Sequence, residues 1–226
     1  MAITTTGELV LADAGTVADL RTFVTRARTA DDGGIRLQGA GPVLAAYVCV
    51  MRAKLLGEGT PTILGLRTMA LAAPADIDVT VSLASVADRL ARMGEDETAL
   101  PVPPMTLNES WAAVSAPRGG WEEVATVGAD VLIKAARDGV RQIGQTIPVN
   151  PGQLLVNNVR AAVWGRPLDG LDGDVATTAV PAGAAFAAYA LGFVAPGETG
   201  AVFRSNRWLR LSTPRGHVLV RPTAVL

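Results

Sequence analysis

Residues 43–52 read VLAAYVCVMR, an almost unbroken apolar run. Successive side chains of a β-strand point to opposite faces of a sheet, and both alternating sets are apolar in this run. This pattern is typical of a strand whose sheet is covered on both faces. We therefore expect residues 43–52 to form a central strand around which the fold is built.

Three further stretches around this run have the character of strands. Residues 35–38 and 77–83 alternate apolar with polar residues, the pattern of a strand with one face exposed to water. Residues 62–71 are mostly apolar and lie between two turn signals. Together with residues 43–52 they predict a four-stranded antiparallel sheet in the N-terminal part of the chain.

Helices are expected at both ends of this sheet. Thr16 and Asp19 form a capping-box-like pair before an apolar stripe with helical spacing, which predicts a helix over residues 16–31. Ser85 and Asp88 repeat the pattern before a shorter helix. The N-terminal part is therefore predicted as a helix, four strands and a second helix.

The C-terminal part is predicted to be mainly helical. Apolar periodicity indicates three helices, over residues 128–145, 153–164 and 181–194. In the second of these helices, Leu154 and Leu155 are expected to face inward. The last element is a predicted β-hairpin with strands at 208–212 and 217–221, joined by a turn whose proline and glycine favour type I.

An acidic, proline-rich segment at 95–104 separates the two parts and has the composition of a linker. The predicted fold class is α+β: an N-terminal antiparallel four-stranded sheet with flanking helices, then a C-terminal helical unit ending in a β-hairpin. The predicted regions are an α+β antiparallel-sheet domain over 1–94, a linker or crossing segment over 95–120, and a helical domain with a basic C-terminal hairpin over 121–226.

The composition is that of a folded protein. Of 226 residues, 49% are hydrophobic and 18% are charged, far from the composition of disordered chains. The formal net charge of -1 gives the molecule no overall field that would attract nucleic acid or an anionic membrane. Residues 1–15 lack the features of a signal peptide, and the uncharged stretch 175–197 is broken by proline and glycine. We expect a cytoplasmic protein with no membrane partner.

Few residues could carry chemistry. A single His and a single Cys exclude a zinc site and a disulfide framework, so neither a metal nor a cofactor is expected. His217 lies near Ser212 in sequence, a pair that nucleophilic catalysis could use, but no serine elbow precedes a helix. The acidic loop at 169–174 lacks the alternating ligand spacing of an EF-hand. An enzyme is therefore the third choice of function.

The C-terminal hairpin is basic. Residues 201–226 contain five arginines and no acidic residue. Three helices followed by a hairpin resemble a winged-helix arrangement, which would make the chain a DNA-binding regulator. The helix expected at 181–194 offers no Arg, Lys, Asn or Gln to read bases, so nucleic acid is possible but disfavoured. The predicted interaction surface consists of Arg204, Arg207, Trp208, Arg210, Arg215 and Arg221.

Four segments resemble uncharacterised conserved proteins of high-GC actinobacteria. They are GLRTMAL at 65–71, VWGRP at 163–167, AFAAYALGF at 185–193 and WLRLSTPRGHV at 208–218. The excess of arginine, 18 against two lysines, suits that origin. The resemblance carries no assigned chemistry, so it implies no active-site residues.

The leading prediction of function is a non-enzymatic cytoplasmic binding or protein-interaction protein. Its expected partner is another protein or a second copy of the chain, giving a homo-oligomer, because no constellation of catalytic residues is found. A winged-helix-like DNA-binding regulator is the alternative, and an enzyme with a polar pocket is the third possibility.

Overall fold

A computed structural model describes residues 7–53, 59–173 and 179–222. Within these residues the fold is α+β, with five helices and a seven-stranded antiparallel sheet in the order β2-β3-β9-β8-β7-β5-β6. The chain divides into two compact units. The first comprises Met1–Val50 and Leu66–Ser115, and the second comprises Met51–Gly65 and Ala116–Leu226. No helix among the described residues is long and apolar enough to cross a membrane.

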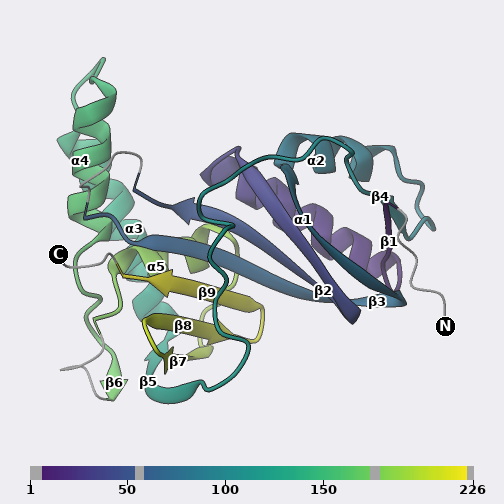
Figure 1. Cartoon of the computed structure of the whole chain (residues 1–226). Helices are drawn as coiled ribbons and strands as arrows, with labels where there is room; N and C mark the ends of the chain where they lie inside the picture. The colour runs from purple at the N-terminus through teal and green to yellow at the C-terminus, as the bar shows by residue number, and fades with distance from the viewer. Residues whose placement is uncertain (1–6, 54–58, 174–178, 223–226) are drawn as a thin grey trace. The chain divides into compact units, whose positions relative to one another are not determined.

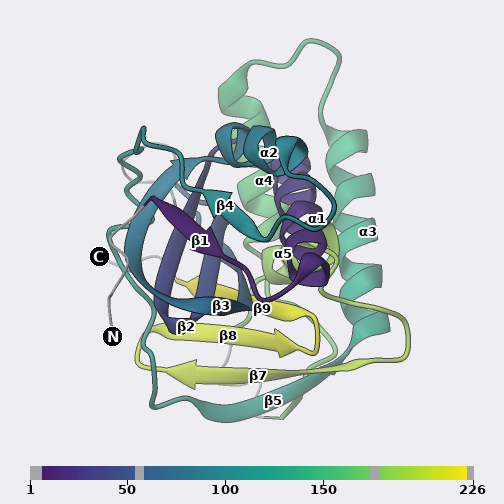
Figure 2. The same ribbon diagram turned by 90° about the vertical axis from the view of Figure 1, so that its right-hand side faces the viewer.

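The first unit contains two helices and most of two long strands. The long strands are β2 (Gly34–Met51) and β3 (Thr62–Ser82), and the helices are α1 (Ala14–Ala30) and α2 (Leu83–Arg92). Helices α1 and α2 lie side by side, and the short strands β1 (Glu8–Val10) and β4 (Ala99–Pro101) pair antiparallel (Figure 2). One apolar stripe of α1 is buried: Val17, Leu20, Phe23, Val24 and Ala27.

The four strands predicted in this unit are parts of only two strands. The glycines at 39 and 41 do not end β2: Gly41 adopts φ +59°, and a Cβ on Gly39 would lie 2.8 Å from the Cβ of Ala75 in β3. The absence of a side chain at Gly39 therefore lets β2 and β3 approach closely, and the chain does not reverse direction at these glycines. The prediction of a central strand at 43–52 is wrong, because β2 is at the edge of the sheet. Along 43–48 only residues 44, 46 and 48 are buried, so one face of β2 is covered there.

Both helices of this unit begin before the predicted residues. Helix α1 is capped by Asp13, whose Oδ1 accepts hydrogen bonds from the backbone N and Oγ1 of Thr16 at 2.6 and 2.8 Å. Asp19, expected in the cap, instead pairs with Arg67 of β3 at 2.6 Å. The predicted cap residue is therefore the hydrogen-bond donor, and the true cap lies three residues earlier.

Arg36 connects β2 with the last residues of the first unit. Its guanidinium forms a bidentate pair with Asp78 of β3, both contacts at 2.6 Å, and donates to Ser115 Oγ and the Ala112 carbonyl. The hydrogen bond to Asp78 raises the pKa of Arg36. Part of the segment expected as a linker at 95–120 therefore belongs to the first unit, and the division at 94 and 120 stays a prediction.

The second unit combines a β-meander with three helices (Figure 1). Its strands are β5 (Glu122–Gly128), β6 (Asp172–Gly173), β7 (Thr199–Ser205), β8 (Trp208–Thr213) and β9 (Gly216–Arg221). Its helices are α3 (Ala129–Thr146), α4 (Gln153–Trp164) and α5 (Ala182–Ala190). The three predicted helices and the terminal hairpin are confirmed. The sequence patterns did not predict β5 and β7, which pair antiparallel with each other.

Candidate functional site

The basic hairpin is part of a larger sheet. Strands β8 and β9 pair through the turn between Thr213 and Gly216, and β8 also pairs along its length with β7, which continues to β5. A wing would extend from a helical core as a separate hairpin, whereas this hairpin has β7 along one side. The winged-helix interpretation therefore has no support in the structure.

Arg210 of this hairpin is held between two aromatic rings. Its guanidinium carbon lies 4.6 Å from the centroid of Trp121 and 4.6 Å from that of Phe203, its cross-strand partner. The Nε atom is buried without a hydrogen-bond partner among the described residues. Burial lowers the pKa of Arg210. Arg210 thus makes cation–π contacts within its own unit, which reduces its availability to an external phosphate.

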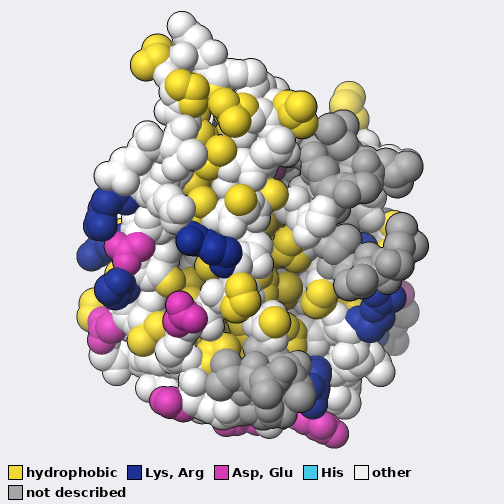
Figure 3. Space-filling view, turned by 90° about the vertical axis from the view of Figure 1, so that its left-hand side faces the viewer, with side chains coloured by type: hydrophobic (Ala, Val, Ile, Leu, Met, Phe, Trp, Pro, Cys, Tyr) yellow, Lys and Arg dark blue, Asp and Glu magenta, His cyan; other side chains and the backbone are white. Residues whose placement is uncertain are grey.

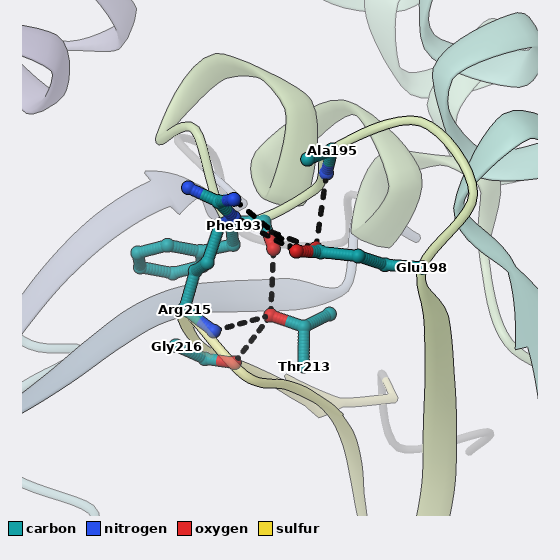
Figure 4. A network of polar contacts seen from close by, with 6 residues as sticks. All are labelled: Phe193, Ala195, Glu198, Thr213, Arg215 and Gly216. Carbon is teal, nitrogen blue, oxygen red and sulfur yellow. Dashed lines mark hydrogen bonds and ion pairs between the residues drawn. The ribbon is translucent and has the colours of Figure 1, made fainter.

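Arg215 belongs to a polar network at the tip of the hairpin (Figure 4). Its guanidinium pairs with Glu198 at 3.2 Å, and Glu198 also accepts from the Ala195 backbone N–H. Thr213 Oγ1 donates to the Phe193 carbonyl at 2.6 Å and accepts from the Arg215 backbone N–H. The network ties the β8–β9 turn to the loop after α5 and neutralises the Arg215 charge.

The remaining residues of the predicted surface are not equivalent. Arg221 lies over the ring of buried Trp208, with its guanidinium carbon 5.9 Å from the ring centroid. Arg204 is half-buried on β7. Arg207 is exposed in the β7–β8 turn, next to Asn206 at φ 51°, and pairs with no described residue. The role of these residues in an interaction stays a prediction.

Ser212 and His217 are brought together as the sequence suggested. They are cross-strand partners, and His217 Nδ1 lies 2.9 Å from Ser212 Oγ. This register alone places a hydroxyl next to an imidazole, because directly opposite residues share one face of the sheet. The pair gives the geometry of a side-chain hydrogen bond, whereas a catalytic serine also needs donors for an oxyanion.

A more open feature lies on the helical side of the second unit. A pocket of about 290 Å³ runs along one face of α3 and is also lined by residues 163–164, residues 166–169 and Ala182. Its apolar lining includes Val131, Val163 and Trp164, and its polar lining comprises Lys134, Asp138, Gln142, Arg166 and Asp169. The described lining has no hydroxyl, thiol or imidazole.

Four of the polar side chains in this lining form two pairs, Lys134 with Asp138 and Arg166 with Gln142. Lys134 Nζ lies 2.6 Å from Asp138 Oδ2, Arg141 lies 3.1 Å from Asp138 Oδ1, and Arg166 Nη2 donates to Gln142 Oε1 at 2.6 Å. The hydrogen bond from Lys134 lowers the pKa of Asp138. Arg141 is outside the lining, which carries two basic residues, Lys134 and Arg166, and two acidic ones, Asp138 and Asp169, so it has no strong preference for an anion or a cation.

Trp164 forms the floor of the pocket and joins three helices. It ends α4, is 1% exposed, and stacks on Phe186 of α5 with ring centroids 4.7 Å apart. On α3 it covers Gly139, where an added Cβ would overlap the indole ring. Gly183 of α5 is also closely packed, because a Cβ there would lie 2.6 Å from Ile63 Cδ1 and 3.2 Å from the Trp164 Cβ. Gly139 therefore makes room for the indole ring, and Gly183 allows α5 to approach Ile63 and the backbone of Trp164 closely.

Beyond this anchor the two helices have no core of their own. No residue from 140 to 162 is buried. We call residues 140–162 the α3–α4 hairpin. The expectation that Leu154 and Leu155 face inward is wrong, since both are exposed. Hydrophobic side chains gather at this end of the molecule, where Figure 3 shows no Lys, Arg, Asp or Glu side chain.

The expected absence of a metal remains a prediction. No three His, Cys, Asp or Glu side chains converge among the residues that the structure describes. Within the acidic loop at 169–174, Asp174 lies outside those residues. Cys49 is a buried residue of β2, as its apolar surroundings in the sequence suggested.

Two family models match the chain. Residues 4–112 match DUF8010 and residues 116–225 match DUF8185, and both are described as domains of unknown function. The matches meet where the compact units divide, near Ser115. The chain thus contains two domains of unknown function, in line with its resemblance to uncharacterised proteins, while the actinobacterial origin stays a prediction. No curated protein matches the chain in sequence.

Solved structures of DNA polymerase sliding clamps share the fold. A DnaN sliding clamp (DNA polymerase III subunit beta) from Bartonella birtlesii bound to griselimycin has a TM-score of 0.55 at 9% identity, covering 97% of this chain and 65% of that chain. The pol III beta of Caulobacter crescentus gives 0.52 at 11% identity, covering 96% and 66%. The sliding clamp from Pseudomonas aeruginosa with ligand gives 0.50 at 10% identity, covering 97% and 65%.

This chain therefore spans 65% to 66% of the length of these clamps. At such low sequence identity the likeness shows the fold alone. The α+β architecture is clamp-like, which replaces the winged-helix arrangement that the order of elements suggested.

The Trp164 anchor generates a stability prediction. Gly139→Ala places a methyl group into the indole ring, so we expect unfolding free energy to fall by about 1–3 kcal/mol, the cost of overpacking a tight core. Gly144→Ala in the same helix meets no atom within 4 Å and is the matched control. It should stabilise the protein by about 0.5–1 kcal/mol through helix propensity. Urea unfolding of both variants measures the difference, and equal stability would contradict the packing described.

Proposed function

We propose that this chain is a non-enzymatic interaction protein that uses its clamp-like fold to present the α3–α4 hairpin to another protein surface. The proposal includes the cytoplasmic location expected from the sequence. One observation carries it: residues 140–162 form two helical arms without a single buried residue, although many of them are apolar. Large apolar patches on a protein that folds by itself usually mark a contact surface.

The chemistry of the second unit supports a role without catalysis. In the pocket beneath the hairpin, Lys134 pairs with Asp138 and Arg166 with Gln142, and the described lining has no hydroxyl, thiol or imidazole. Ser212 and His217 lie on β8 and β9, outside that lining. The nucleophile and its base are thus not placed where the pocket could hold a substrate.

The likeness to sliding clamps supports contact with other macromolecules. The clamp from Bartonella birtlesii is named as a subunit of DNA polymerase III and is therefore part of a protein assembly. We extend to this chain only the use of such a fold as a contact platform. The partner, which is another protein or a second copy, belongs to the proposal.

DNA binding is the second candidate function, because the similar structures are clamps of a DNA polymerase and the β8–β9 hairpin is basic. Two contacts weigh against it. Arg210 is stacked between aromatic rings and Arg215 is paired with Glu198, so neither guanidinium is free for a phosphate without losing an internal contact. Arg207, in the β7–β8 turn beside this hairpin, is exposed and is the most available of these arginines.

Photo-cross-linking inside cells that express the full chain tests the proposed function. With p-benzoylphenylalanine in place of Leu154, we expect covalent adducts with protein, because that side chain is 60% exposed on the contact surface. The same probe at Met105, which is 78% exposed in the first unit, is the control. Adducts at 154 should exceed those at 105 and disappear when Leu155→Glu is added. Equal yields at the two positions would overturn the proposal.

A duplex titration tests the second candidate. By fluorescence anisotropy with random DNA at about 0.15 M salt, we expect binding weaker than the roughly 1–100 micromolar range of non-specific DNA binders. The Arg207→Ala variant and the control Arg28→Ala, on α1, should then behave like the unchanged protein. Sub-micromolar binding that falls steeply with salt and is weakened by Arg207→Ala alone would favour the DNA-binding function instead.

A further inference from the structure

We infer that the α3–α4 hairpin packs against the same hairpin of a second copy of this chain, forming a four-helix bundle about a two-fold axis. The inference rests on the proposed function and names the occupant of its contact surface. Helices α3 and α4 lie side by side and are joined by a short loop at 147–152, so two such hairpins contain the four helices that a bundle needs (Figure 1).

The hairpin needs a partner for its own stability. Helix α4 has 12 residues and buries only Val163 and Trp164, both at its C-terminal end. Isolated helices shorter than about 12–15 residues are marginal in water, and in proteins they are stabilised by packing of an apolar face. The apolar side chains available for that packing are exposed: Val149 at 92%, Leu154 at 60%, Val140 at 49% and Leu155 at 43%.

The distribution of charge favours a second copy as the partner. No residue between Arg141 and Arg160 is charged. In a two-fold interface the same patch meets itself, so any charge near the axis would face its own like charge. A surface that recognised a charged partner would carry complementary charges. The α3–α4 hairpin has charged residues only near its two ends, at Arg141 and Arg160. An uncharged apolar patch can meet a copy of itself without repulsion.

The polar groups of the hairpin are also self-complementary. Gln153 and Asn157 lie one turn apart on α4, with Gln153 Nε2 donating to Asn157 Oδ1 at 2.9 Å, and Asn158 lies beside them. An amide side chain both donates and accepts hydrogen bonds. Identical amides can therefore pair across a two-fold axis, which carboxylates or ammonium groups cannot do. These amides would form the polar rim around the leucine contacts.

Sedimentation equilibrium of the purified full chain tests the inference. We expect a reversible dimer whose dissociation constant rises by about 100-fold or more with Leu154→Glu, since each substitution buries an unpaired carboxylate twice in a symmetric interface. Val149→Glu, in the loop, should weaken the dimer in the same direction and cannot affect the core. Met105→Glu, an exposed position of the first unit, should leave the dissociation constant unchanged.

Circular dichroism should find each variant folded, because none of the three residues is buried in the monomer. A protein that stays monomeric up to about 100 micromolar would overturn the inference, because its association would be too weak for a specific interface. A dimer unaffected by Leu154→Glu and Val149→Glu would overturn it as well. If the chain is monomeric but cross-links through position 154 to a different protein, the inference fails while the proposed function stands.

Discussion

The contact between Trp164 and Gly139 determines the arrangement of the second unit. One indole ring ends α4, covers a glycine of α3 and stacks on Phe186 of α5, so three helices meet at a single buried side chain. The ring fits only because Gly139 lacks a side chain, since a Cβ there would overlap the indole. All three helices are held together around Trp164. In the α3–α4 hairpin, residues 140–162, neither helix buries a further residue.

In this geometry, the residues that stabilise the second unit differ from those that we propose for contact with a partner. The meander of β5, β7, β8 and β9 and the small residues of α5 form a core that does not depend on the α3–α4 hairpin. The exposed arms can therefore present leucine and valine side chains at little cost to the core. The basic hairpin is organised in the opposite way: its arginines stack on Trp121, Phe203 and Trp208 or pair with Glu198, and so contribute to the unit itself.

Local sequence patterns predicted most helices and the terminal hairpin, but they predicted less well which side chains are buried and which strands pair. The bounds of α4 follow from periodicity alone, yet the direction of Leu154 was mispredicted, because a period identifies an apolar face but not whether anything covers it. Strand β7 and the Arg210 sandwich depend on pairing between residues distant in the chain, such as Trp121 with Arg210, which no local pattern contains. A usable signal was present: the stretch between Arg141 and Arg160, which we propose as a contact surface, carries no charged residue.

Hydrogen exchange of the full chain at several protein concentrations tests most directly whether the α3–α4 hairpin depends on a partner. At low concentration, amides at 154–162 of α4 should exchange much faster than those at 132–139 of α3, because only the latter range contains buried residues. Protection at 154–162 should then increase with concentration, while that at 132–139 stays constant. Slow exchange throughout α4 that does not change with concentration would contradict the account, because the hairpin would then be stable alone.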